Sequence, residues 1–157
     1  MNDKQIRLLA TGGILSAAIF LLTAFFRIPI GAGYLNFGDV GVFFAAMTLP
    51  WGYAALCAGI GSALADLYGY PAYTPVTLLV KAAAALTFAL LWRRLPGRLR
   101  YLAFLSVLLI PAGYFVFERF AAGAFAWADL PWNLLQSVVG AALAFLIERL
   151  TEGRLTL

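Results

Sequence analysis

DLYGYPAYTPVTLLVK, residues 66–81, is the stretch around which the chain is organised, because it places a carboxylate, three tyrosines, two prolines and a lysine between long apolar runs. Lys81 belongs to an apolar run that continues without another charge to Trp92. At about 1.5 Å of rise per residue, it sits about 10 Å along a helix that starts near Thr74. This is membrane depth, where a lysine must face a cavity or pair with a carboxylate.

The composition indicates an integral membrane protein. The chain has 157 residues, of which 64% are hydrophobic and 11% charged, and its mean hydropathy is +0.92. The net charge of +4 lies mostly in segments that flank apolar runs, so membrane topology explains it better than nucleic-acid binding. The single cysteine, Cys57, excludes a disulfide framework, and without histidine a zinc site is not expected. We expect no metal and no cofactor.

The apolar runs predict an all-α membrane protein in which residues 1–157 form one compact bundle of six transmembrane helices. The expected crossings are 6–26, 35–49, 53–67, 74–92, 101–117 and 132–147. A turn-rich loop is expected at 27–34 and a longer loop at 118–131, with Pro131 at the start of the last helix. The second and third helices are short, so Asp39 and Asp66 should lie below the lipid headgroups in a recess lined by protein.

The distribution of Lys and Arg predicts that both termini are cytoplasmic. With that orientation the outer ends carry only Arg27 and Arg119. The inner ends carry the other basic residues that flank the spans, which are Lys4, Arg7, Arg93, Arg94, Arg98, Arg100, Arg149 and Arg154.

Polar side chains converge at the predicted outer end. Thr74, Thr77 and Lys81 form one stripe down the fourth helix, with Asp39 and Asp66 as the carboxylates nearest in depth. This lysine either forms a structural ion pair or lines a ligand pocket.

The fifth and sixth helices send similar stripes to the same end. Tyr114 and Glu118 are one turn apart, as are Asn133 and Gln136. The two amides could bind a neutral heteroaromatic ligand or hydrogen-bond neighbouring helices. Aromatic side chains in or beside the outer loops, among them Tyr73 and Trp132, could stack on such a ligand or belong to the interfacial aromatic belt.

Small residues mark one side of the first helix, at Ala10, Gly13 and Ala17. The spacing of Gly13 and Ala17 lets another helix approach closely. That helix could belong to this chain or to a partner protein.

Four segments, in order along the chain, carry a resemblance to a known family. They are YLNFGD (34–39), GSALAD (61–66), PVT (75–77) with Lys81, and PWN (131–133) with Gln136. The set resembles the substrate-binding S components of energy-coupling-factor (ECF) vitamin transporters, closest to the branch of the hydroxymethylpyrimidine, pyridoxine and riboflavin types.

The resemblance implies high-affinity binding of a vitamin or vitamin precursor at the outer face of a bacterial cytoplasmic membrane. It also implies docking, through Ala10, Gly13 and Ala17, onto a transmembrane scaffold subunit that two ATPase subunits drive. Segment 27–36 would act as a lid. This chain has Gly13 where the family motif has a second alanine. The residues expected to bind the substrate are Asn36, Asp39, Asp66, Tyr73, Thr77, Lys81, Tyr114, Glu118, Trp132, Asn133 and Gln136.

Two other functions are compatible with a small helical membrane protein. A six-helix scaffold that binds other proteins would have no cavity of ligand size, because its polar residues would pair between helices. An intramembrane enzyme is disfavoured, because histidine is absent and the carboxylates show no nucleophile or metal-ligand spacing.

Overall fold

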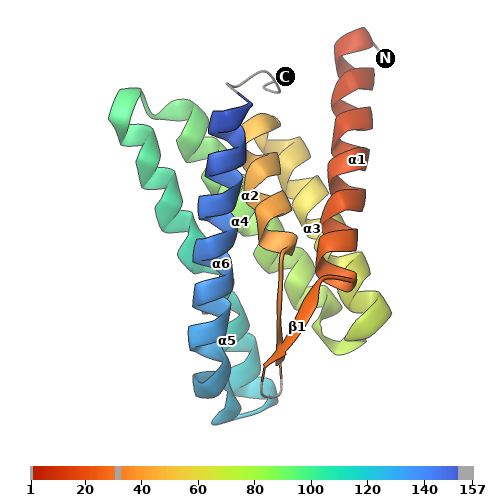
Figure 1. Cartoon of the computed structure of the whole chain (residues 1–157), viewed down its shortest axis with the longest axis vertical. Helices are drawn as coiled ribbons and strands as arrows, with labels where there is room; N and C mark the ends of the chain where they lie inside the picture. Colours follow the sequence, from red (N-terminus) through yellow and green to blue (C-terminus); the bar gives the residue numbers. More distant parts are fainter. Residues whose placement is uncertain (1, 31–32, 152–157) are drawn as a thin grey trace.

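The computed structural model describes residues 2–30 and 33–151, and within them the chain forms six α-helices, two 3-10 helices and a two-stranded hairpin (Figure 1). The α-helices are α1 (Asp3–Ala24), α2 (Gly38–Thr48), α3 (Trp51–Gly69), α4 (Thr74–Arg94), α5 (Leu109–Ala121) and α6 (Phe125–Leu150). The 3-10 helices are η1 (Pro71–Tyr73) and η2 (Gly97–Leu108), and the strands are β1 (Arg27–Ile30) and β2 (Gly33–Asn36).

Length and apolarity single out four segments of the described chain as able to cross a membrane: Asp3–Ala24, Pro71–Arg94, Gly97–Ala121 and Phe125–Leu150. Helix α2 is different, because its 11 residues reach only about 16 Å at 1.5 Å per residue. It cannot cross the hydrocarbon core, which is about 30 Å thick, by itself.

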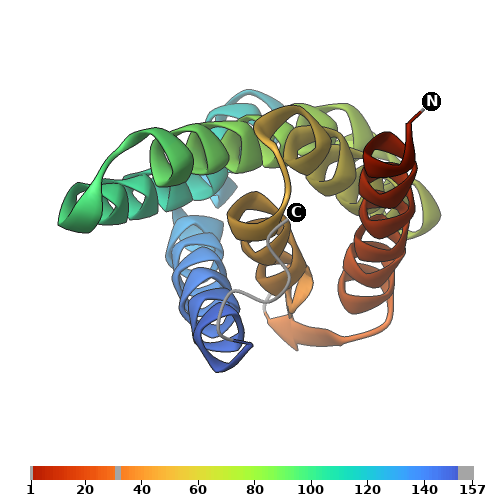
Figure 2. The same ribbon diagram turned by 90° about the horizontal axis from the view of Figure 1, so that it is seen from above.

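Helix α2 is the centre of the bundle. It contacts α1, α3, α4 and α6, and the view from above shows it between α1 and α6 (Figure 2). Most of its residues are buried, and only Val40 and Phe44 remain partly exposed. A helix that is apolar on every side is stable when protein surrounds it. Because α2 is short and central, the space beyond its first residue is left for other groups to fill.

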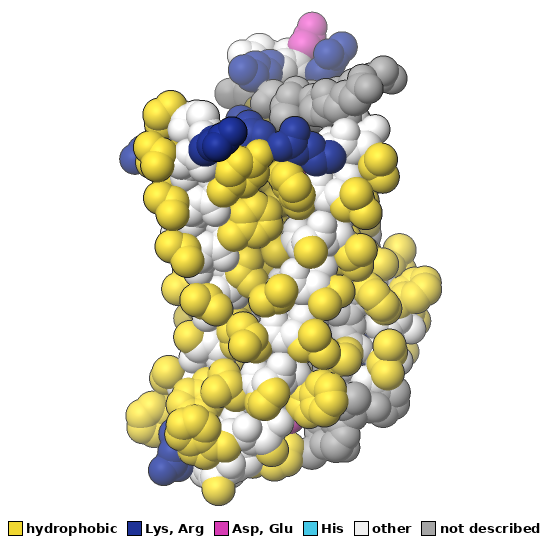
Figure 3. All heavy atoms as spheres, turned by 60° about the vertical axis from the view of Figure 1, so that its left-hand side comes forward, with side chains coloured by type: hydrophobic (Ala, Val, Ile, Leu, Met, Phe, Trp, Pro, Cys, Tyr) yellow, Lys and Arg dark blue, Asp and Glu magenta, His cyan; other side chains and the backbone are white. Residues whose placement is uncertain are grey.

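The two ends of the bundle differ in charge. The start of α1 and the last turn of α6 lie at the same end (Figure 1), where Lys and Arg side chains gather above an apolar flank (Figure 3). Arg93 and Arg94 close α4 there, and Arg149 lies in the last turn of α6. Near this end the core is aromatic, with the ring of Phe88 5.4 Å from that of Phe43 and 5.7 Å from that of Trp92. The hairpin lies at the opposite end.

Most of the predicted loop at 27–34 instead forms the strands of an antiparallel hairpin, and its residues 31–32 lie outside the described part of the chain. β1 and β2 pair in a register that sets Arg27 opposite Asn36 and Ile28 opposite Leu35. The two strands are too short to show a clear alternation of apolar and polar residues, whereas the glycines at their junction are typical of a turn. The sequence therefore predicts a loop here. The hairpin lies directly before α2, so its groups cover the N-terminal end of that helix (Figure 1).

The predicted loop at 118–131 was wrong. Helix α5 continues to Ala121 and α6 already starts at Phe125, so the connection is only 122–124. Gly123, with φ of +66°, supplies the left-handed conformation that a tight reversal needs. Pro131 therefore lies inside α6 and not at its start. Neighbouring helices can compensate for the hydrogen bond that a proline removes inside a membrane helix.

Candidate functional site

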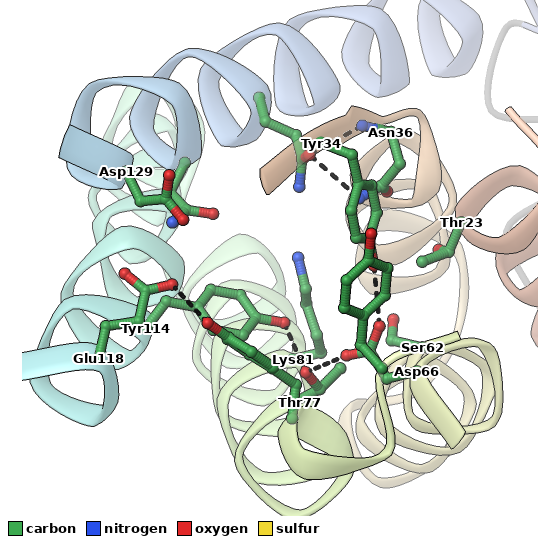
Figure 4. Close-up of a pocket in the computed structure, with 14 residues that line it drawn as sticks. Thr23, Tyr34, Asn36, Ser62, Asp66, Thr77, Lys81, Tyr114, Glu118 and Asp129 are labelled. Atoms are coloured by element: carbon green, nitrogen blue, oxygen red, sulfur yellow. Dashed lines mark hydrogen bonds between the residues drawn. The ribbon is translucent and has the colours of Figure 1, made fainter. Parts of the chain in front are cut away.

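A pocket opens at the hairpin end of the bundle, beyond the end of α2 (Figure 4). Its empty space, including the part open to solvent, is about 630 Å³. The lining residues come from α1, β2, α3, α4, α5, α6 and the η1 turn: Thr23, Tyr34, Asn36, Ser62, Asp66, Tyr70, Tyr73, Thr77, Lys81, Tyr114, Glu118, Asp129, Asn133 and Gln136.

Lys81 forms the floor of the pocket and is paired with Asp39. Its ammonium donates to the Asp39 carboxylate, and both side chains are buried, with 4% and 1% exposure. The other carboxylate oxygen accepts from the Gln136 amide at 3.2 Å and from the Ser137 hydroxyl at 3.3 Å. The Lys81 ammonium also lies 5.4 Å from the ring centre of Tyr114. This ion pair therefore ties α2, α4 and α6 together beneath the cavity.

Asp66 organises one wall of the pocket. The Tyr34 hydroxyl donates to one of its carboxylate oxygens at 2.9 Å, and the Thr77 hydroxyl donates to the other at 2.5 Å. Thr77 in turn shares a 2.8 Å hydrogen bond with the Tyr114 hydroxyl. Burial and the negative charge of Asp66 raise the pKa of Tyr34 well above its ordinary value.

The hairpin is fastened to the bundle over the cavity. The Asn36 backbone and side-chain amides both donate to the Gln136 amide oxygen, at 2.9 and 3.0 Å. On the other side, the ring of Tyr34 stacks on Tyr70 with centres 4.9 Å apart, and the Arg27 guanidinium lies 4.5 Å from the Tyr34 ring centre. Polar and aromatic contacts thus hold strand β2 between α6 and the segment after α3.

The far wall, formed by α5 and α6, carries two carboxylates. Glu118 and Asp129 project toward the cavity from neighbouring helices (Figure 4). The Tyr73 hydroxyl donates weakly to one oxygen of Glu118, at 3.5 Å. Three buried atoms on pocket residues have no hydrogen-bond partner within the described chain: Thr23 Oγ1, Ser62 Oγ and Glu118 Oε2. Unpaired buried polar atoms are uncommon in native proteins, so these atoms indicate a place for a ligand or bound water.

All the residues predicted to bind substrate line this pocket except Asp39 and Trp132. Asp39 lies beneath Lys81 and is covered by it. Trp132 is 42% exposed on α6. This exposure fits its alternative interpretation as a residue of the interfacial aromatic belt. The cavity itself is the feature that a purely protein-binding scaffold would lack.

Five lining residues were not among the predicted set: Thr23, Tyr34, Ser62, Tyr70 and Asp129. For Tyr34 and Tyr70, the sequence indicated only that aromatic residues lie in or beside the outer loops. Asp129 was missed because its segment was expected to be a loop. Once α6 is extended to Phe125, Asp129, Asn133 and Gln136 follow helical spacing and share a face. Thr23 and Ser62 carried no sequence signal that distinguished them.

No group of three or more His, Cys, Asp or Glu side chains within residues 2–30 and 33–151 is arranged to hold a metal ion.

The backbone as a whole matches a solved structure described as "Structure and mechanism of the S component of a bacterial ECF transporter". The TM-score is 0.72, and the match covers 95% of this chain and 97% of the other, at 19% sequence identity. The fold is therefore that of an ECF S component.

The family model described as "ECF-type riboflavin transporter, S component" matches residues 3–151. The chain belongs to this family and is an integral membrane protein. S components are the substrate-binding subunits of transporters and not enzymes. A curated relative from Pyrococcus woesei, named "Uncharacterized protein in gap 3'region", is 42% identical over 66 residues. That match covers 41% of this chain and 45% of the relative, so it spans less than half of either protein.

Proposed function

We propose that this protein captures a vitamin or vitamin precursor in the pocket at its hairpin end, for ATP-driven uptake by an ECF transporter. The observation that carries the proposal is a set of buried polar atoms without a partner among the described residues, on Thr23, Ser62 and Glu118, which line one cavity from three helices. Tyrosine rings on two sides of the cavity suit a planar heteroaromatic ligand, and the side chain of Asn133 can fix its orientation.

In this proposal the pocket faces outward, all six helices take part in the crossing, and both termini are cytoplasmic in a bacterial cytoplasmic membrane. The concentration of Lys and Arg at the end opposite the pocket supports that orientation. The short helix α2 supports an outward recess, because its first turn lies below the hairpin and leaves depth for a ligand.

The proposed partners are an ECF transmembrane scaffold subunit and two ATPase subunits. Helix α1 is available for docking, since Ala10, Gly13 and Ala17 are all exposed. A methyl group built at Gly12 or Gly13 would have no neighbouring atom within 4 Å. This surface lets another helix approach the α1 backbone closely.

A binding screen on the purified full-length protein tests the proposal. B vitamins and their precursors, including riboflavin, pyridoxine and hydroxymethylpyrimidine, would be added in detergent while the melting temperature is followed, and co-purified small molecules would be identified by mass spectrometry. We expect at least one compound to stabilise the protein. Asn133→Ala should weaken that stabilisation, whereas Leu56→Ala, at a side chain 63% exposed on α3, should not.

Uptake measured in cells with and without the scaffold and ATPase subunits tests the second half of the proposal. Uptake that does not depend on those subunits, or a protein that no compound stabilises, would contradict it.

A further inference from the structure

We infer that the ligand of this pocket is a planar organic cation, with its ammonium or amidinium group held between Glu118, Asp129 and Asn133. The inference rests on the proposed function and specifies the class of substrate.

The first step is the balance of charge around the cavity. Three carboxylates line it, on Asp66, Glu118 and Asp129, against a single lysine. That lysine, Lys81, is already paired with a fourth carboxylate, Asp39, which lies outside the lining. The pair cancels, so the cavity presents an excess of negative charge. Such an excess favours a positively charged ligand.

Arg27 offsets only part of this excess, because it lies outside the cavity lining. Its guanidinium is 4.5 Å from the ring centre of Tyr34 and 5.4 Å from that of Tyr70. It donates to the backbone carbonyls of Thr23 at 2.9 Å and Ala65 at 3.3 Å, and it is not part of the pocket lining.

The second step asks which carboxylate oxygens already accept hydrogen bonds within the protein and which do not. Both oxygens of Asp66 accept hydrogen bonds, from Tyr34 and Thr77. Glu118 is 2% exposed, yet its Oε2 has no partner within the described residues and its other oxygen has only the weak 3.5 Å bond from Tyr73. A buried carboxylate oxygen without a donor is costly, and a cationic N–H group from a ligand would satisfy it.

The third step is the shape of the subsite. Glu118 on α5 and Asp129 on α6 project toward the same space (Figure 4), and Asn133 follows Asp129 by one turn on the same face. Carboxylate and amide oxygens from two helices can therefore accept several N–H bonds from one group. A metal ion fits less well, because the described chain offers no cluster of three acidic, histidine or cysteine ligands there.

The tyrosine rings that line the cavity favour a cation that is part of a planar molecule. The hydroxyls of Tyr34 and Tyr114 are engaged in the Asp66 network, which fixes both rings. Tyr73 lies with its ring centre 6.3 Å from that of Tyr114 on the carboxylate side. Ordered rings of this kind bind planar ligands by stacking and attract positive charge to their faces.

Two matched pairs of compounds test the inference on the full chain in detergent. Pyridoxamine differs from pyridoxine, and 4-amino-5-aminomethyl-2-methylpyrimidine from its 5-hydroxymethyl analogue, by an aminomethyl group in place of a hydroxymethyl group. Riboflavin serves as the neutral reference. Affinities would be measured by calorimetry for the wild type and for Glu118→Gln, Asp129→Asn and Asp3→Asn. Asp3→Asn removes the same charge at the distant exposed start of α1.

We expect the aminomethyl member of at least one pair to bind about tenfold or more tightly than its partner, as loss of a charge-assisted hydrogen bond implies. Glu118→Gln and Asp129→Asn should each reduce that preference while the unliganded melting temperature stays within a few degrees, and Asp3→Asn should preserve it. Equal or tighter binding of the hydroxymethyl members, or of riboflavin alone, would overturn the inference and leave the proposed function standing. Binding of none of these compounds would overturn the inference, and the proposed function would fall with it only if no compound in the wider vitamin screen stabilised the protein.

Discussion

Breaking the Lys81–Asp39 pair should destabilise the protein strongly and reveal the role of Lys81. The two side chains are 4% and 1% exposed and lie in the centre of the bundle. Lys81→Met leaves the Asp39 carboxylate with only the two longer bonds from Gln136 and Ser137. Removing one partner of a buried pair costs about 3 to 5 kcal/mol. For a chain of this size that corresponds to a loss of about 6 to 20 °C in melting temperature.

A double-mutant cycle isolates the interaction. Asp39→Asn keeps an oxygen that can accept from Gln136 and Ser137 but strands the Lys81 ammonium without a counter-charge. In Lys81→Met/Asp39→Asn neither charge remains, so we expect at least half of the loss in the single variants to be recovered. Stability would be followed by thermal and denaturant unfolding of the purified protein in detergent.

Ligand binding by the same four proteins separates the two roles of Lys81. If the lysine only neutralises Asp39, the double variant regains binding. If its ammonium contacts the ligand, binding stays weak although the fold is restored. Single variants that each cost less than about 1 kcal/mol, or a double variant whose loss equals the sum of the two, would refute the reasoning from a buried, coupled pair.

Three further predictions concern helix packing, docking and the hairpin. Gly140→Ala should cost about 1 to 3 kcal/mol in an unfolding assay, because the new methyl carbon would lie 2.5 Å from Asp39 Cβ and 3.0 Å from its carbonyl carbon. Gly12→Ala, with open space around it, should be neutral, and equal costs at the two glycines would contradict the packing argument. Gly13→Leu should abolish ECF-dependent uptake but preserve ligand binding by the isolated protein; intact uptake would show that α1 docks elsewhere. Tyr34→Phe removes the 2.9 Å bond to Asp66, so amide exchange in strand β2 should accelerate, and an unchanged rate would mean that Asn36 and Gln136 alone hold the hairpin.

Much of the architecture could be read from the pattern of apolar runs. Each of the six predicted helical regions contains a helix, because in a bilayer the backbone must satisfy its own hydrogen bonds and few alternatives exist. The boundaries near residues 118–131 failed for a local reason. Pro131 is typical of a helix start, the charges of Glu118 and Asp129 interrupt the apolar runs, and nothing local shows that two packed helices contain them.

Lys81, buried in an apolar run, required a carboxylate or a cavity on physical grounds alone, and the stripes on α4, α5 and α6 indicated the end at which polar groups gather. Which carboxylate pairs with Lys81 is decided only by the tertiary structure. Asp39 and Asp66 were equal candidates by depth, and the packing of α2 against α4 and α6 brings Asp39 to Lys81 while Asp66 turns to Thr77 and Tyr34. Only the tertiary structure leaves one oxygen of the buried Glu118 without a donor among the described residues, because the sequence carries the charges but not the distances that decide which of them are satisfied.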